Sequence, residues 1–181
     1  MKPSTKFLPL IFVAALAFTA LVPAARAEES ATNTIVDVAI AANSSGPFAG
    51  QFDILIAAVL AADPAVLQEL TNRSQNTVFA PTDDAFVALL AELGITADDL
   101  LGNQALLTEV LLYHVAWGNR NAASVLASPR IRTLQGEALF QSGGVLTDSN
   151  GRTSTIIATD IFASNGVIHV IDTVVLPDLS E

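Results

Sequence analysis

The sequence has 181 residues, of which 51% are hydrophobic, and a formal net charge of −10 at pH 7 with no cysteine. An acidic surface repels a phosphate backbone, which argues against nucleic acid as a partner. The lack of cysteine excludes thiol catalysis, iron–sulfur clusters and thiolate metal sites. The length suffices for one domain with its own hydrophobic core.

Residues 1–27 have the three-part pattern of a secretory signal peptide. Lys2 and Lys6 form a positive segment, residues 7–22 form an apolar run, and Ala-Arg-Ala ending at Ala27 is the small-x-small pattern of a cleavage site. The alternative is an uncleaved anchor, but the run is shorter than the roughly 20 residues of a spanning helix. We expect cleavage after Ala27 and a protein that is secreted, extracellular or periplasmic.

Cleavage would make the chain still more acidic. It leaves 154 residues and removes three of the eight basic residues but none of the 18 acidic ones, giving a formal charge of −13 and no lysine. This charge argues against docking on anionic lipid, and no later segment is long and apolar enough to cross a bilayer, so we expect no membrane-embedded part. The predicted organisation is a short leader at 28–32, one domain at 33–177 and a tail at 178–181.

The first half of the mature chain, residues 33–117, has the apolar periodicity of helices. Thr34 begins the first helix, and a loop over residues 46–51 follows it. Asp53 is predicted to cap the second helix. Asp63-Pro64 places a capping aspartate before a proline at the first helical position, which predicts the start of a third helix.

A short buried strand at residues 77–80 interrupts these helices and ends at Pro81. Thr82 is predicted to cap the next helix, with Asp83 in its first turn, where the helix dipole favours negative charge. A further helix from about residue 103 to residue 115 follows.

The second half, residues 124–177, alternates apolar and polar residues with the period of strands. Asn150-Gly151 and Asn165-Gly166 predict two hairpins with type I′ turns, because these residues tolerate positive φ angles. Gln135-Gly136 separates another pair of strands. In the last strand, residues 167–176, the alternation points His169 inward.

Three segments resemble the conserved boxes of one protein family. Residues 77–86, TVFAPTDDAF, are similar to the first box, and residues 112–115, LYHV, are similar to the central Tyr-His motif. Residues 165–172, NGVIHVID, are similar to the second box, and residues 34–39 resemble the usual opening. On these motifs the sequence is identified as a member of the fasciclin family over residues 33–177.

The resemblance implies an α+β fold, a fasciclin-type β-wedge of about seven strands with helices packed along one edge. It implies structural roles for the motif residues Thr82, Asp83, His114, His169 and Asp172. In the family the central histidine ties its helix to the turn that carries Thr82 and Asp83. The stretch 46–51 departs from the family pattern as a small insertion.

The Tyr-His motif is assigned to integrin recognition in animal relatives, which implies partner binding by Tyr113 and His114. The alternative is a packed tyrosine, because Leu111 and Leu112 beside it have a buried pattern. For both His114 and His169 we expect a core position with the ring hydrogen-bonded, since buried polar groups are nearly always paired.

Catalysis is not expected. The two histidines lack a His-x-x-x-His spacing, and neither a Gly-x-Ser-x-Gly elbow nor a phosphate-binding glycine loop occurs. The acidic pairs Asp83-Asp84 and Asp98-Asp99 fall in first helical turns, where capping explains them. The prediction is therefore a protein that is not an enzyme and has no metal or cofactor.

The expected function is a secreted module that adheres to a cell-surface or matrix protein or polysaccharide. The alternative is a carrier of a small lipophilic ligand such as a carotenoid or lipid. Some fasciclin-like proteins bind carotenoids, and this chain is unusually apolar. The Phe48 loop and the helix pair 34–42 and 53–62 are the first place to expect a pocket.

Overall fold

The computed structural model of the protein describes residues 33–179. The predicted signal peptide and leader lie outside the described residues, as do residues 180 and 181 of the predicted tail.

One seven-stranded sheet organises the chain, in the order β2-β1-β7-β6-β5-β4-β3. Its strands are β1 Asn76–Pro81, β2 Val115–Trp117, β3 Arg130–Arg132, β4 Ala138–Ser142, β5 Val145–Thr147, β6 Thr153–Ala163 and β7 Gly166–Ile171. β1 and β7 are parallel, and the other neighbouring strands are antiparallel. A single bridge between Ala116 and Thr133 brings the ends of the sheet together, so that it is nearly closed. The predicted α+β wedge of seven strands is thus confirmed.

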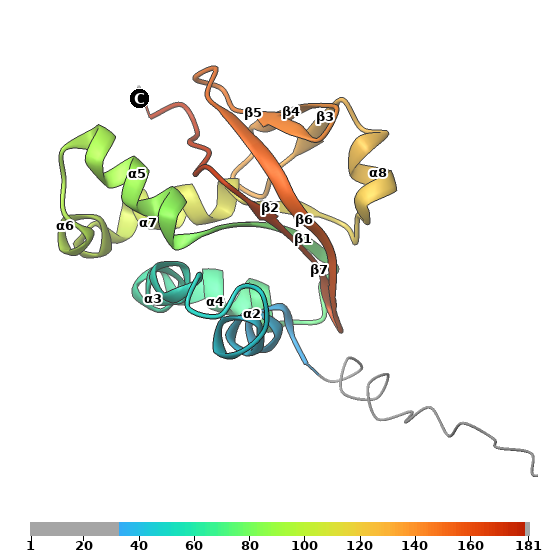
Figure 1. The fold of residues 1–181 in the computed structure, drawn as a ribbon, viewed down its shortest axis with the longest axis horizontal. Helices are drawn as coiled ribbons and strands as arrows, with labels where there is room; N and C mark the ends of the chain where they lie inside the picture. Colours follow the sequence, from blue (N-terminus) through green and yellow to red (C-terminus); the bar gives the residue numbers. More distant parts are fainter. Residues whose placement is uncertain (1–32, 180–181) are drawn as a thin grey trace, which may run out of the picture.

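Most of the helices lie together on one side of this sheet (Figure 1). The described helices are α2 Ile35–Ser44, α3 Asp53–Ala61, α4 Pro64–Thr71, α5 Asp83–Leu93, α6 Ala97–Gly102, α7 Gln104–Tyr113 and α8 Ala122–Leu126. α2 to α7 follow the predicted arrangement. The short helix α8 lies apart from them, beside β3, β4 and β5 (Figure 1), and was not predicted.

Every residue of the parallel strands β1 and β7 is buried, so both faces of this part of the sheet are covered. Val78 and Ile168 pack into the core beneath the helices. Phe79 and Ile171 pack into a second core, inside the wedge formed by the curled sheet. Burial on both faces explains why these strands have few polar positions, as is typical of parallel pairs.

Two predicted backbone features are wrong in detail. Asp53 does not cap α3: the cap position is Phe52, which makes no side-chain capping bond, and the Asp53 carboxylate accepts from Asn43 Nδ2 at 2.7 Å. The Asn150-Gly151 and Asn165-Gly166 hairpins form between the predicted strands, but not as type I′ turns. Among the non-glycine residues described, positive φ occurs at Asp160 alone, so neither asparagine has the angle that this turn requires.

Within residues 33–179, no single helix combines the length and apolar character needed to cross a membrane. α3 and α4 reach that length and composition only as a pair, and the pair is bent by 116° at its break.

Candidate functional site

Tyr113 ends α7 and lies in the core of the wedge, with 0% of its surface exposed. Its hydroxyl donates to the Ala138 carbonyl at 3.3 Å and accepts from the Ser149 amide at 3.2 Å. Burial raises the pKa of this phenol. The side chain therefore joins the end of α7 to β4 and to the turn between β5 and β6.

His114 follows directly and is 3% exposed. Its Nδ1 lies 2.7 Å from the Val110 carbonyl, and its Nε2 lies 3.3 Å from the Val175 amide. A carbonyl requires a donor and an amide requires an acceptor, so the ring is neutral with the proton on Nδ1. Burial lowers the pKa of His114 to about 4.

The ring of His114 thus ties α7 to the segment that follows β7. The resemblance implied a tie to the Thr82-Asp83 turn instead, but both ring nitrogens are already engaged by Val110 and Val175. Partner binding by Tyr113 and His114 stays a prediction. The burial of both side chains agrees with the packed alternative, since a partner could reach them only if the core opened.

Thr82 and Asp83 hold the starts of two helices together. The Thr82 hydroxyl accepts from the Ala85 amide at 3.4 Å and so caps its own helix, α5. The Asp83 carboxylate accepts from the Asp53 and Ile54 amides at 3.1 and 2.9 Å, and so caps α3 across 30 residues of sequence. A carboxylate at a helix N-terminus satisfies free amides and complements the helix dipole.

His169 on β7 is also fully buried and bonded at both ring nitrogens. Nδ1 accepts from the Asp160 amide at 3.3 Å, and Nε2 donates to the Arg120 carbonyl at 2.8 Å. Asp172, just after β7, accepts from the Thr155 amide at 2.8 Å. Both residues connect β7 to neighbouring segments, and both ring nitrogens of His169 are engaged.

Asn165 was predicted only as a turn residue, yet its buried side chain links three segments. Its Oδ1 accepts from the Ile35 amide, and its Nδ2 donates to the Leu70 and Asn72 carbonyls, all at 2.8 Å. These contacts fix the start of α2 and the end of α4 on the turn between β6 and β7. No local pattern in the sequence signals them, because the partners lie more than 90 positions away.

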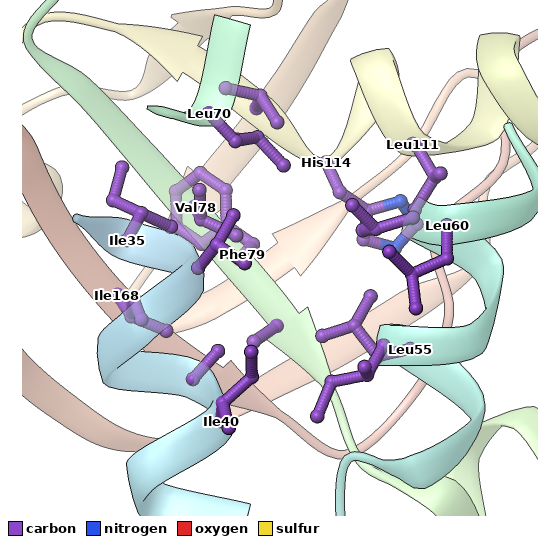
Figure 2. Close-up of a pocket in the computed structure, with 16 residues that line it drawn as sticks. Ile35, Ile40, Leu55, Leu60, Leu70, Val78, Phe79, Leu111, His114 and Ile168 are labelled. Atoms are coloured by element: carbon purple, nitrogen blue, oxygen red, sulfur yellow. The ribbon is translucent and has the colours of Figure 1, made fainter. Parts of the chain in front are cut away.

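An apolar pocket of about 80 Å³ lies between α2 and α3 (Figure 2). Its walls carry Ile40 on α2 and Leu60 on α3, which are 45% and 68% exposed. Its lining is apolar apart from His114 and comprises Ile35, Val36, Ala39, Ile40, Leu55, Ile56, Val59, Leu60, Leu70, Val78, Phe79, Ala80, Leu111, His114, Val115 and Ile168.

The helix pair predicted to form a pocket therefore lines this one. Phe48 does not line it: its ring packs on Phe52 instead, with the ring centroids 5.8 Å apart. The contributions of β1 and α7, through Val78 and Leu111, were not predicted. Among residues 33–179, no group of three histidine or carboxylate side chains is placed to hold a metal ion.

Comparisons with known proteins agree with this architecture. The model of the Fasciclin domain family matches residues 50–177. Protein sll1483 from Synechocystis sp. is 43% identical over 151 residues, covering 81% of this chain and 74% of that protein. The transforming growth factor-beta-induced protein ig-h3 from Sus scrofa is 36% identical over 132 residues, covering 72% of this chain but 18% of ig-h3.

Among solved structures, the FAS1 domain pair from the insect cell adhesion molecule Fasciclin I matches with a TM-score of 0.51. The identity is 19%, and the match covers 65% of this chain and 42% of that one. This likeness concerns the fold alone, which is that of a FAS1 domain. Together with the sequence matches it shows that the chain belongs to the fasciclin family.

Proposed function

We propose that this protein is a secreted, non-catalytic fasciclin module that adheres to cell-surface or matrix components. The observation that carries the proposal is the contrast between the interior and the surface of the sheet. Tyr113, His114 and His169 are engaged inside, whereas the aromatic side chains of Trp117 and Phe140 are 55% and 50% exposed. Exposed aromatic residues are typical of binding surfaces, where they supply much of the binding energy.

Two further facts support adhesion outside the cell. The signal-peptide pattern of residues 1–27 favours export. One solved structure with the same fold is a FAS1 domain pair from an insect cell adhesion molecule. Membership of the fasciclin family agrees with this function.

Beads coated with residues 28–181 are expected to attach to cells or envelope fragments of the producing organism. The control is beads coated with an unrelated acidic protein of similar charge, which removes attachment due to charge alone. The number of beads retained after washing is the measurement. Equal retention of the two kinds of bead would contradict an adhesive function.

We further propose a second function, the binding of a small lipophilic ligand in the pocket between α2 and α3. The apolar lining and the exposed Ile40 and Leu60 support it. An engineered apolar cavity of about 150 Å³ holds benzene, so the 80 Å³ found here accepts only part of a larger ligand. Binding of a carotenoid or lipid chain therefore requires α2 and α3 to move apart.

Filling the pocket is expected to abolish this binding. Ala39 lines the pocket, and Ala39→Phe would place a ring in the space between α2 and α3. We expect at least tenfold weaker binding of a fluorescent polyene fatty acid, measured by titration. Ala41→Phe, on an exposed position of the same helix that does not line the pocket, is the matched control. Unchanged affinity of a folded Ala39→Phe variant would show that the ligand does not enter here.

A further inference from the structure

The few basic residues of this acidic domain are gathered in one part of the sequence. Residues 110–136 contain no aspartate or glutamate but three of the five arginines after Ala27, namely Arg120, Arg130 and Arg132. The rest of the described chain holds 15 acidic residues and two arginines. A local excess of positive charge therefore exists on a domain that is strongly negative elsewhere.

The fold places these arginines beside the exposed aromatic residues. On β3, Arg130 and Arg132 are exposed while Ile131 between them is buried. The register with β4 sets Phe140 opposite Arg130, whose guanidinium carbon lies 6.0 Å from the ring centroid. Phe140 and Arg130 thus form a cation–π pair on the outer face of the sheet.

Trp117 extends this outer face on the other side of β3. The antiparallel bridge pairs Ala116 with Thr133, both buried, so the next pair along is Trp117 with Arg132. Residues opposite each other in antiparallel strands point to the same face. Trp117, Arg130, Arg132 and Phe140 therefore share one outward face, which we call the β3 strip.

Among residues 33–179, neither arginine of the β3 strip has an acidic ion-pair partner. Both ion pairs found in residues 33–179 belong to Arg152. The nearby Arg120 donates to the Trp117 carbonyl at 3.0 Å and to Ser128 Oγ at 3.4 Å, and so supports the strip from its side. Side chains two residues apart on one face of a strand are about 7 Å apart. The strip thus presents two guanidinium groups that make no ion pair within the described residues, with Phe140 against Arg130 and Trp117 opposite Arg132.

We propose that the β3 strip binds an acidic polysaccharide, whose carboxylate or sulfate groups pair with Arg130 and Arg132. Guanidinium binds such planar or tetrahedral anions through paired hydrogen bonds. The rings of Trp117 and Phe140 offer broad apolar faces against which the C–H face of a sugar can stack. This inference rests on the proposed adhesive function and names the partner's chemical class.

The charge of the domain favours a polysaccharide over two other occupants. A second copy would bring its own large negative charge and be repelled at long range. DNA carries one charge per about 1.7 Å of its axis, far denser than two arginines can neutralise. A glycan with a single carboxylate or sulfate on each sugar is less densely charged than DNA, so a short stretch can contact the strip while the acidic remainder of the surface repels it elsewhere.

Immobilised residues 28–181 are expected to bind polygalacturonate or dextran sulfate but not neutral dextran, with binding that weakens as salt is raised. The first two probes distinguish a carboxylated from a sulfated ligand. Arg130→Gln and Arg132→Gln should each weaken binding at least fivefold, and Trp117→Ser likewise. Arg73→Gln, which removes an equal charge outside the strip, is the matched control and should leave binding unchanged.

Three results would overturn the proposal. One is the absence of binding to either acidic polysaccharide by the wild type. Another is an equal loss in Arg73→Gln, which would indicate a general charge effect. The third is a concentration-dependent dimer that Arg130→Gln abolishes, which would identify a second copy as the occupant. If the coated beads still attach to cells in any of these cases, the strip proposal fails while the adhesive function stands; if attachment also fails, both are wrong.

Discussion

Gly166→Ala is expected to destabilise the fold by about 4 kcal/mol or more. Single substitutions cause losses of this size only through severe steric or burial defects. A Cβ at this position would lie 2.0 Å from the Asn76 carbonyl oxygen and 2.8 Å from Ile35 Cδ1. The oxygen belongs to the backbone of β1, whose residue Asn76 pairs with Gly166 in the parallel β1–β7 register. Relief of the clash therefore requires β1 and β7 to separate.

Gly151→Ala is the matched control, because Gly151 occupies the corresponding place in the other Asn-Gly hairpin. Its φ of 81° strains a side chain, but a Cβ there meets nothing within 4 Å. We expect a loss of about 1–2 kcal/mol from the backbone conformation alone. Urea denaturation of both variants measures the difference. Equal losses would show that turn conformation, and not the approach of β1, makes Gly166 necessary.

The contrast between these two glycines illustrates what the sequence can predict. The capping contacts of Thr34, Asp63 and Thr82 span two or three residues, and all three predicted helix starts are confirmed. The Asn150-Gly151 and Asn165-Gly166 signals are equally local, and a hairpin forms at each of them, although the last strand ends at Ile171 and not at the predicted residue 176. Signals that lie within one turn of the chain are thus visible in the sequence.

Contacts between segments that are distant in the sequence could not be predicted from it. The Asp83 carboxylate caps α3 from about 30 residues away. The local pattern instead indicated Asp53 as the cap, and that prediction is wrong. The helix α8, Ala122–Leu126, overlaps the start of the region predicted to form strands, residues 124–177. The first amide of α8, Ala122 N, donates to Asp160 Oδ1 at 2.8 Å. The Asn121 side chain caps the helix by accepting from the Ser124 amide. Only the folded chain brings Asp160 to this place.

The same distinction applies to the candidate site. The apolar faces of α2 and α3 predicted where a pocket would lie, because helical periodicity marks the faces that turn inward. The floor of the pocket comes from β1 and α7, and the β3 strip requires the closure of the sheet between Ala116 and Thr133. Neither follows from periodicity, since both depend on which strands become neighbours.

The free energy of unfolding is expected to fall by about 2 kcal/mol between pH 7 and pH 5 because of His114. Burial lowers the pKa of His114 to about 4 in the folded state, against 6.5 for an exposed histidine, and outweighs the opposing effects of the Val110 hydrogen bond and the Asp148 charge. The unfolded chain therefore takes up a proton first as the pH falls. Each pH unit between about 6.5 and 4 removes roughly 1.4 kcal/mol of stability, and the loss reaches about 3 kcal/mol at pH 4.

The geometry of the ring gives the physical cause of this loss. A proton on Nε2 would face the Val175 amide, itself a donor, and would place an unpaired charge in the core. The carboxyl groups of Asp37 and Asp99, whose pKa values are lowered by hydrogen bonds from Thr34 and Thr96, lose their contribution only below about pH 5. The range from pH 7 to pH 5 therefore separates the histidine from these carboxylates.

His114→Gln tests the assignment, because glutamine offers one donor and one acceptor but does not titrate in this range. Urea denaturation at pH 7, 6 and 5 should show a slope in the wild type that is absent or much reduced in the variant. The variant is expected to be less stable at pH 7, since an amide cannot match the positions of both ring nitrogens. A variant that keeps the full wild-type slope would show that the proton is taken up elsewhere, and that the tie between α7 and Val175 is not the acid-sensitive contact of this fold.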